Sequence, residues 1–269
     1  MSTGYHIVVC AGIVPDPLQT LEPIETPGGP GLKNEMLLPA VLDPWASHAL
    51  YEAANLAAHH PGSKVWLVSL GAKAKLQQVM MTIGQRVALE LIAIDGPASG
   101  FTESSQVAAA ISAAIETIAG LDKPRLLLFG GWESASRGAG TTMQMVGERL
   151  GIVDQFQGVD ELKIGEDGSL RILERIEGGR HQVSVCVGPP ALFGWATGNL
   201  AEPSNNPQIG MQNMRGIMPA LQKAKPAQLG AGPRFENVAL PRQQRDTQIV
   251  KDKSAEEIAR EIVEWVTAE

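Results

Sequence analysis

The sequence predicts an α/β fold, a three-layer sandwich with a mostly parallel sheet. Four short apolar runs alternate with stretches of helical periodicity, and these runs are His6–Ala11, Val65–Leu70, Leu89–Asp95 and Arg125–Phe129. Runs that are too short for a surface helix are typical of parallel strands covered on both faces. A repeated strand-helix order of this kind builds a parallel sheet with right-handed crossovers and helices on both faces.

Helix signals separate the apolar runs. Asp43 is a good N-cap and Pro44 suits the first helical position, so we predict a helix that begins there and ends near His60. Thr102–Ala119 has the apolar stripe of a sheet-covering helix, formed by Val107, Ala110, Ile111, Ala114, Ile115 and Ile118. A further helix is predicted over Thr141–Leu150, because its composition favours helix formation.

The loop that follows the fourth run is a candidate phosphate site. In an open α/β sheet, ligands bind beyond the carboxyl ends of the strands, and the N-terminus of the next helix offers free N–H groups to an anion. The loop adds hydroxyl groups at Ser134, Ser136, Thr141 and Thr142. Its glycines, Gly131, Gly138 and Gly140, match neither a Walker A motif nor a Rossmann fingerprint. An ordinary strand-to-helix connection is therefore the open alternative.

From Gly158 onward the pattern becomes that of β-hairpins. Turns of sequence Gly-Glu-Asp-Gly and Glu-Gly-Gly-Arg join three β-like segments, Leu162–Ile164, Leu170–Ile176 and Gln182–Val187. We therefore assign residues 1–197 to one α/β nucleotide-binding domain with β-hairpin additions.

The C-terminal part is predicted to bind a partner protein. Residues 198–245 are rich in Pro, Gly, Asn and Gln and show little periodicity, which predicts a long extended arm. Within residues 246–269, Ser254 and Glu257 form a capping-box signature that opens a last helix. Its apolar stripe of Ile258, Ile262 and Val266 would dock on another subunit or on the chain's own domain, and both readings stay open.

Composition and charge argue against several functions. The formal net charge of -7, without a Lys/Arg stripe, disfavours nucleic-acid binding. No apolar run approaches the roughly 18 residues of a membrane span, and the N-terminus lacks the build of a signal peptide, so we expect a cytoplasmic protein without membrane insertion. Cys10 and Cys186 lie in apolar runs away from any metal-ligand spacing and are expected to be buried thiols. We assign no metal site and no catalytic residue, because no histidine has a recognisable nucleophile or carboxylate motif around it.

Several motifs occur together in the order known from one protein family. Val9–Pro17 resembles a strand followed by Val-Lys-x-Val-x-Asp-Pro, and Asp43–Ala53 resembles Asn-Pro-Phe-x-Glu-x-Ala-x-Glu-Glu-Ala. Gly131–Met145 resembles Gly-Lys-Gln-x-x-Asp-x-Asp-x-x-Gln-Thr-Gly-Gln-Met. Further matches are Val68–Gly71, Glu174–Gly179 (Arg-Glu-x-Asp-Gly-Gly), Leu200–Pro203 (Leu-Asn-Glu-Pro) and Met214–Met218. From His6 to about Pro226 the chain thus resembles the beta subunit of electron transfer flavoprotein.

The resemblance implies an electron carrier of the adenine nucleotide alpha hydrolase-like fold. In the family, an alpha subunit holds the redox-active FAD, a flavin-dependent dehydrogenase supplies electrons, and the beta subunit buries AMP. By position, the residues expected around the second nucleotide are Cys10, Ala11, Asp43, Leu70, Ser134, Ser136, Arg137, Gly138, Ala139, Gly140, Thr141 and Thr142.

The same resemblance implies two further contacts. Asp16 and Pro17 would approach the flavin of the alpha subunit. The stretch from Pro203 to Met218 corresponds to the recognition loop that docks dehydrogenases, with Ile209, Met211, Met214 and Ile217 as expected partner-docking residues. Methionine suits such a contact because its flexible thioether adapts to a pocket.

The candidate nucleotide loop departs from the family pattern. Ser136, Arg137 and Gly138 replace the part of the loop that carries aspartates, so we expect either AMP or no nucleotide there. Arg137 could compensate through a bidentate contact with a phosphate. A second FAD, as in the electron-bifurcating branch, is disfavoured because the Asp-Thr-x-x-Val-Gly-Pro loop is absent. The rival functions are a nucleotide-hydrolysing or adenylating enzyme and a stand-alone nucleotide-binding protein of the universal-stress type.

Overall fold

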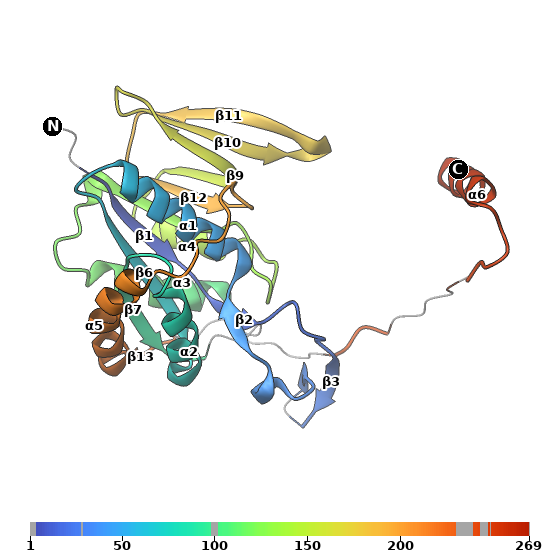
Figure 1. The fold of residues 1–269 in the computed structure, drawn as a ribbon, viewed down its shortest axis with the longest axis horizontal. Coiled ribbons are helices and arrows are strands. Elements are labelled where there is room, and N and C mark those ends of the chain that lie inside the picture. Colours follow the sequence, from blue (N-terminus) through green and yellow to red (C-terminus); the bar gives the residue numbers. More distant parts are fainter. Residues whose placement is uncertain are drawn as a thin grey trace.

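A nine-stranded sheet organises the computed structural model, which describes residues 4–27, 29–97, 102–229, 239–242, 247 and 249–268 (Figure 1). The strand order is β11-β10-β9-β12-β8-β1-β6-β7-β13. The bounds are β1 His6–Cys10, β6 Lys64–Gly71, β7 Glu90–Asp95, β8 Leu126–Gly131, β9 Asp154–Ile164, β10 Leu170–Ile176, β11 Arg180–Cys186, β12 Ala191–Trp195 and β13 Lys225–Pro226.

The sheet is parallel from β9 to β13, and β10 and β11 add antiparallel strands beyond β9. The four apolar runs are β1, β6, β7 and β8, so the predicted mostly parallel sheet is confirmed. His6 pairs in register with Lys64 on one side and Leu126 on the other. Strand β12, which lies between β8 and β9, was not predicted.

Helices cover both faces of the sheet, which confirms the three-layer sandwich. The helices α1 (Pro44–His59), α2 (Lys73–Ile83) and α5 (Pro207–Lys223) contribute to the core on one face. The helices α3 (Ser104–Glu116) and α4 (Thr142–Arg149) contribute to the core on the other. Side chains of β1 alternate between these cores, as the pleat of a strand requires: Ile7 and Val9 enter one, and Val8 and Cys10 the other.

Aromatic packing joins the strands at the centre of the sheet. The rings of Phe129 and Phe193 meet edge to face with their centroids 5.3 Å apart, and Trp195 lies 5.4 Å from Phe129. Phe156 stacks on Phe193 at 5.7 Å. Because these residues come from β8, β12 and β9, the contacts fasten the unpredicted strand into the sheet.

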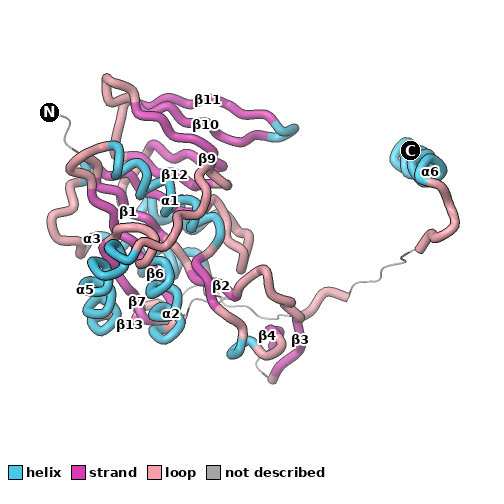
Figure 2. The backbone as a smooth tube through the Cα atoms, in the orientation of Figure 1, coloured by secondary structure: helices cyan, strands magenta, loops and turns pink. Residues whose placement is uncertain are grey.

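The predicted hairpins are confirmed, with β9 beginning well before the expected Leu162. The strands β9, β10 and β11 extend beyond the helix-covered part of the sheet (Figure 2). Two short antiparallel pairs follow β1, namely β2 (Ile13–Pro15) with β5 (Ala40–Leu42) and β3 (Pro23–Thr26) with β4 (Gly29–Leu32). Short 3₁₀ turns occupy Glu35–Leu37, Lys123–Arg125 and Glu177–Gly179.

The predicted irregular arm over residues 198–245 is wrong in part, because α5 occupies 17 of those residues. The side chain of Asn206 caps this helix by accepting hydrogen bonds from the backbone N–H groups of Gln208 and Ile209. Its buried face is Gly210, Asn213, Ile217 and Leu221, at helical spacing. Two of these four positions are not apolar, so a pattern based on hydrophobicity did not reveal the helix.

Asn213 fixes α5 to the rest of the domain. Its side-chain nitrogen donates hydrogen bonds of 2.7 Å to the carbonyl oxygens of Gly84 and Val87, and its oxygen accepts one of 3.4 Å from the N–H of Leu89. The residue is 6% exposed. The Asn213 amide therefore supplies hydrogen-bond partners to backbone groups of the buried turn between α2 and β7.

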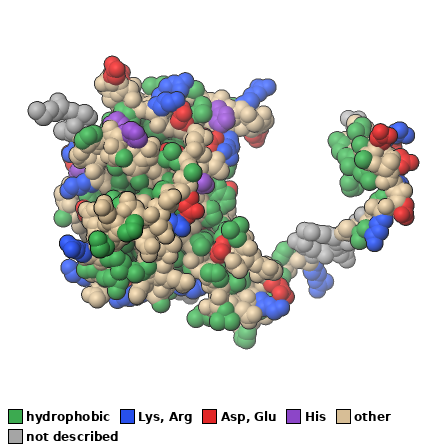
Figure 3. Space-filling model, viewed as in Figure 1, with side chains coloured by type: hydrophobic (Ala, Val, Ile, Leu, Met, Phe, Trp, Pro, Cys, Tyr) green, Lys and Arg blue, Asp and Glu red, His purple; other side chains and the backbone are tan. Residues whose placement is uncertain are grey.

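The last helix, α6 (Ala255–Thr267), begins with the predicted capping box, in which Ser254 and Glu257 bond to each other's backbone N–H. None of its residues is buried, and hydrophobic side chains gather on one side of it (Figure 3). It lies apart from the sheet (Figure 1), and its stripe of Ile258, Ile262 and Val266 is exposed among the described residues.

Replacing Asn213 tests how α5 is held. We expect Asn213→Ala to lower the free energy of unfolding by about 2–4 kcal/mol, because it leaves two buried carbonyl groups without a donor. Chemical denaturation of the purified chain measures the change. Gln212→Ala, at the exposed neighbouring position, is the matched control and should stay within about 0.5 kcal/mol of the wild type. Equal effects of the two substitutions would contradict this account of α5.

Candidate functional site

The main pocket lies where the direction of the chain across the sheet reverses. From β1 the chain passes through α1 to β6, its neighbour on one side, whereas β8, its neighbour on the other side, leads through α4 toward β9. The two connections leave neighbouring strands in opposite directions and on opposite faces. This arrangement opens a crevice at the carboxyl ends of β1 and β8, which is the usual ligand position in such sheets.

The pocket contains about 840 Å³ of unfilled space, including space open to solvent. The enclosed part of this space is about 110 Å³, which is below the range of about 300–1,000 Å³ that is usual for small-molecule sites. Of the residues predicted around a nucleotide, every one except Gly138 lines it. Lining residues that were not predicted are Gly12, Ile13, Val14, Ala46, Val107, Ile111, Gly131, Trp132, Glu133 and Met143.

The sequence contained signals for part of this unpredicted lining. Val107 and Ile111 belong to the stripe that predicted a sheet-covering helix, but the sequence does not say which strand ends that helix overhangs. Trp132 and Glu133 directly follow β8 and lie in the matched loop, at the two positions where the family pattern has Lys and Gln. The indole N–H of Trp132 is buried without a hydrogen-bond partner in the described part of the chain.

Asp43 links two walls of the pocket. One carboxylate oxygen accepts the N–H of Trp45 at 3.2 Å, which caps α1, and the other accepts the N–H of Ala135 in the loop after β8 at 2.8 Å. The residue is 2% exposed. Burial raises the pKa of Asp43 to about 6, although the hydrogen bonds from Ala135 and Trp45 act to lower it. The helix cap therefore also sets the position of the candidate loop.

The loop from Ser134 to Thr142 is folded by its own hydrogen bonds and by glycine. The N–H of Gly138 donates to the carbonyl of Ser134 at 2.8 Å, and the N–H of Arg137 donates to the Ser134 hydroxyl at 3.3 Å. Gly138 and Gly140 have φ angles of 62° and 63°, which are strained for other residues. A side chain at Gly140 would also begin 3.1 Å from the carbonyl oxygen of Trp132. The glycines thus let the backbone form the pocket wall.

Arg137 has incomplete hydrogen bonding within the described residues. One terminal nitrogen, Nη1, is buried without a partner there, and the other, Nη2, donates a long hydrogen bond of 3.4 Å to the Thr142 hydroxyl. Burial lowers the pKa of Arg137, while the charge of Glu103 acts in the opposite direction. A partly buried guanidinium with one buried, unpaired nitrogen fits an anionic ligand, so the residues present are compatible with a nucleotide phosphate.

The residues expected near the flavin lie outside this pocket. Asp16 accepts hydrogen bonds from the N–H of Leu18 and the side chain of Gln19, both within its own turn, and Pro17 is exposed. No lining residue of the pocket comes from this turn. The structure therefore does not bring Asp16 and Pro17 together with the candidate nucleotide residues.

The expected docking residues all lie on α5 but differ in their exposure. Met211 is 70% exposed, whereas Ile209 and Met214 are partly buried. Ile217 is 1% exposed and belongs to the core shared with α1 and α2. The expectation of a partner contact is therefore corrected for Ile217, since this side chain already packs inside the domain.

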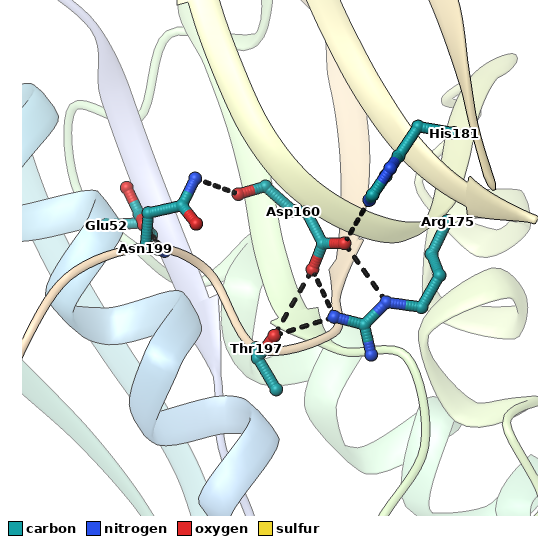
Figure 4. Close-up of polar contacts among 6 residues, drawn as sticks. All are labelled: Glu52, Asp160, Arg175, His181, Thr197 and Asn199. Carbon is teal, nitrogen blue, oxygen red and sulfur yellow. Dashed lines mark hydrogen bonds and ion pairs between the residues drawn. The ribbon is translucent and has the colours of Figure 1, made fainter. Parts of the chain in front are cut away.

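A second polar cluster lies at the hairpins, away from the pocket lining (Figure 4). Asp160 of β9 accepts hydrogen bonds of 3.0 and 2.8 Å from Arg175 and one of 2.9 Å from His181. Thr197 also donates to Asp160 at 3.3 Å. Burial acts to raise the pKa of Asp160, but the bonds from Arg175 and His181 outweigh it and hold that pKa below its usual value. The paired groups indicate a structural cluster.

This cluster, which we call the Asp160 cluster (Asp160, Arg175, His181 and Thr197), is continued toward α1. The side chain of Asn199 donates to the carbonyl of Asp160 at 3.4 Å, and its backbone N–H donates to Glu52 at 3.2 Å (Figure 4). Burial raises the pKa of Glu52. The segment that leads to α5 is thereby attached to both the hairpins and a helix.

Other site types are not found in the described ranges. They contain no group of three or more His, Cys, Asp or Glu residues placed to hold a metal ion. Across the same ranges, no helix combines the length and apolar character needed to cross a membrane. Cys10 and Cys186 are buried free thiols, and burial raises the pKa of Cys10 to about 12.

Comparison with known proteins points to one family. A family model described as the electron transfer flavoprotein domain matches residues 35–228. A search of curated proteins found no match. The matched range contains Asp43, the loop after β8, the hairpins and α5, and it ends before α6.

The buried carboxyl group of Asp43 should make stability depend on pH. Its pKa is raised in the folded state to about 6, so its contribution to stability is present below its unfolded pKa and is lost as the pH rises through about 6. Between pH 4 and pH 7.5, the wild type should therefore lose about 2 kcal/mol relative to Asp43→Asn. Chemical denaturation at both pH values measures this difference.

The exposed Asp252 supplies the control for that measurement. Asp252→Asn should show no comparable change in its stability difference from the wild type. A difference between Asp43→Asn and the wild type that is the same at both pH values would refute the effect of burial on Asp43.

Proposed function

The chain belongs to the electron transfer flavoprotein family, and we propose that it is the beta-type subunit of a heterodimeric electron carrier. In this role it passes electrons from a flavin-dependent dehydrogenase, through FAD held mainly by an alpha subunit, to a downstream acceptor. Bound FAD supplies the redox chemistry. This chain supplies a rigid domain, a nucleotide pocket and surfaces that bind partners.

The observation that carries the proposal is the pocket at the reversal point of the sheet. It is formed by residues of the matched family range together with Cys10 to Val14 of the N-terminal part. Its charged lining residues are Asp43, Glu133 and Arg137, and no pairing of a nucleophile with a base occurs among its described contacts. Apolar walls with one unsatisfied cationic donor support nucleotide binding better than hydrolytic catalysis.

The proposed second nucleotide is AMP, which would be held by this chain alone. The apolar lining from Cys10, Leu70, Val107 and Ile111 suits a base, and the polar loop suits a phosphate. FAD would instead meet the surface near Asp16 and Pro17. The neighbouring Leu18 is 91% exposed, which is consistent with a surface that a partner subunit covers.

Two other surfaces support a heterodimer. Strand β11 is the edge of the sheet, with Val183 and Val185 exposed along it, so it offers both unpaired backbone groups and apolar side chains to another chain. The helix α6 offers an apolar side that none of the described residues covers. We propose that the alpha subunit covers α6, because an amphipathic helix gains stability by packing that face.

The dehydrogenase is proposed to dock at α5 through Met211, with Ile209 and Met214 beside it. A firmly attached helix that carries one protruding, adaptable side chain suits a contact that must form and release repeatedly. The hydrogen bonds of Asn213 keep the helix in place during such contacts.

A stand-alone adenine-nucleotide-binding protein is the second candidate function. It is favoured by one observation, that β1, α1, α3 and the loop after β8 of this chain each contribute a wall of the pocket. An electron-bifurcating subunit with a second FAD is a variant of the first proposal. The cofactor content of the purified protein distinguishes all three.

Cofactor content is the direct test. The chain should be co-expressed with a candidate alpha-type subunit from the same genome, and the purified complex denatured so that released FAD and AMP are quantified by chromatography. We expect one FAD and one AMP per heterodimer. Two FAD would indicate the bifurcating variant, and one FAD without AMP would remove the nucleotide proposal only. A complex without flavin, or no complex, would refute the electron-carrier proposal.

Met211→Glu tests the docking surface. A buried carboxylate in an apolar contact is unfavourable, so we expect the rate of flavin reduction by the dehydrogenase to fall about tenfold or more, with unchanged FAD content. Stopped-flow absorbance of the flavin measures the rate. Val153→Glu, which makes the same change at a residue 90% exposed elsewhere, is the control. A normal rate with Met211→Glu would contradict docking through α5.

A further inference from the structure

The start of α5 is held by the turn that joins α2 to β7. The backbone N–H of Asn206, the N-cap of the helix, donates a hydrogen bond of 2.7 Å to the carbonyl oxygen of Gln85 in that turn. Gly210, one turn further along the helix, is buried, and a Cβ atom there would lie 3.5 Å from Cγ of Gln85. The first turn of α5 therefore rests on Gln85, before the hydrogen bonds of Asn213 attach the next turn.

Arg86, the next residue of the same turn, binds the chain just before the helix. Its Nη1 donates to a carboxylate oxygen of Glu202, with which it forms a salt bridge, and its Nε donates a hydrogen bond of 3.3 Å to the side-chain oxygen of Asn205. The hydroxyl group of Tyr51 in α1 donates to the same oxygen of Glu202 at 3.3 Å. These contacts fix the path of residues 202–205 into the helix.

The contact between Arg86 and Glu202 is suited to setting a position more than to adding stability. The side chain of Arg86 is 24% exposed and that of Glu202 is 57% exposed, and ion pairs open to water contribute little to the free energy of folding. A guanidinium presents its donors in a rigid plane, however, so bonds to two residues restrict the direction of the backbone that joins them. The buried Asn213 supplies the stronger attachment.

The proposed docking residues lie between these two attachments. Ile209 and Met211 come after the N-cap and before Asn213. The N–H of Ile209 donates to the side chain of the N-cap residue, Asn206, at 3.4 Å. A shift of the N-cap would therefore move Ile209 directly and the neighbouring Met211 with it.

We propose that Arg86 is a positioning residue for partner docking: through Glu202 and Asn205 it holds the first turn of α5 in the orientation that the dehydrogenase binds. This inference rests on the proposed docking of a dehydrogenase at α5. Met211 touches the partner, and Arg86 acts through the helix start. Without Arg86 the turn samples several orientations, and the partner has to order it on binding. This weakens docking but leaves electron transfer within the docked complex unchanged.

Amide hydrogen exchange of the purified full-length chain tests the positioning directly. Arg86→Gln removes the guanidinium, so we expect the amides of Asn206 and Gly210 to exchange about two- to fivefold faster, the range of an exposed ion pair. Amides of α5 beyond Asn213 should keep their rates. Unchanged exchange at both Asn206 and Gly210 would overturn the proposal. The melting temperature should stay within about 4 °C of that of the wild type, which verifies that the variant is folded.

The second measurement is the rate of flavin reduction in the heterodimer as the concentration of its electron donor is raised. The probe is a flavin-dependent dehydrogenase that reduces the wild-type heterodimer. Arg86→Gln should raise the half-saturating concentration about two- to tenfold and leave the limiting rate unchanged. Arg149→Gln makes the same charge change at an exposed residue of α4, on the opposite face of the sheet, and should behave like the wild type. An unchanged half-saturating concentration in Arg86→Gln would contradict the role of Arg86.

Further variants separate position from charge. Glu202→Ala changes the net charge in the opposite direction but breaks the same contact, so it should weaken docking as Arg86→Gln does. Arg86→Lys keeps the charge without the planar donors and should weaken docking less. The exchanged pair, Arg86→Glu with Glu202→Arg, should restore most of the wild-type affinity. Normal docking by Glu202→Ala, or no recovery in the exchanged pair, would show that Arg86 acts by its charge and would overturn the proposal.

Failure of this inference is distinguishable from failure of the proposed function. If the wild-type heterodimer accepts electrons and Arg86→Gln docks normally, the inference is overturned and the electron-carrier proposal stands. If Met211→Glu also docks normally, the inference is overturned together with docking at α5. If no flavin-dependent dehydrogenase reduces the wild-type heterodimer, the inference and the electron-carrier proposal are both overturned.

Discussion

The reversal of chain direction between β1 and β8 is the constraint on which the rest of this structure depends. Because neighbouring parallel strands send their connections to opposite faces, neither α1 nor α4 can close over their shared carboxyl ends. The pocket is therefore a consequence of topology. The two segments that must meet there are far apart in sequence, and a single buried carboxylate, that of Asp43, hydrogen-bonds to both.

The Asp43 carboxylate affects both the stability of the fold and the shape of the pocket. Burying a charged group is unfavourable, which is why the pKa of Asp43 is raised, and the backbone N–H groups of Trp45 and Ala135 offset part of the penalty. Gly138 and Gly140 in the same loop adopt left-handed conformations, which let its backbone turn along the pocket wall. The same turn carries Arg137 into the lining of the pocket, where it forms no salt bridge among the described residues, although the charge of Glu103 acts on it.

The sequence predicted the elements whose burial follows a regular period. The runs that became β1, β6, β7 and β8 are continuous and apolar, and the Asp43-Pro44 start of α1 is a local signal. Helix α5 was not predicted because Gly210 and Asn213 occupy its buried face. Asn213 stabilises the helix through hydrogen bonds to a turn that is distant in the sequence, which a hydrophobic pattern does not reveal. The pocket lining was predicted where family motifs reached it. Val107 was missed because only the three-dimensional packing of α3 brings it to the crevice, whereas Trp132 lies in the matched loop at a position where the sequence departs from the family pattern.

The pocket and the α5 surface are supported by separate interactions, and this separation suits an electron carrier. Helix α5 packs with α2 and β7 and is fixed through Asn213, while the segment before it is attached through the Asp160 cluster and Asn199. The pocket depends instead on Asp43, α4 and the loop after β8. None of the lining residues belongs to α5, so a change of docking surface need not disturb the nucleotide site. Partner specificity can therefore vary on one part of the domain while the other keeps its ligand.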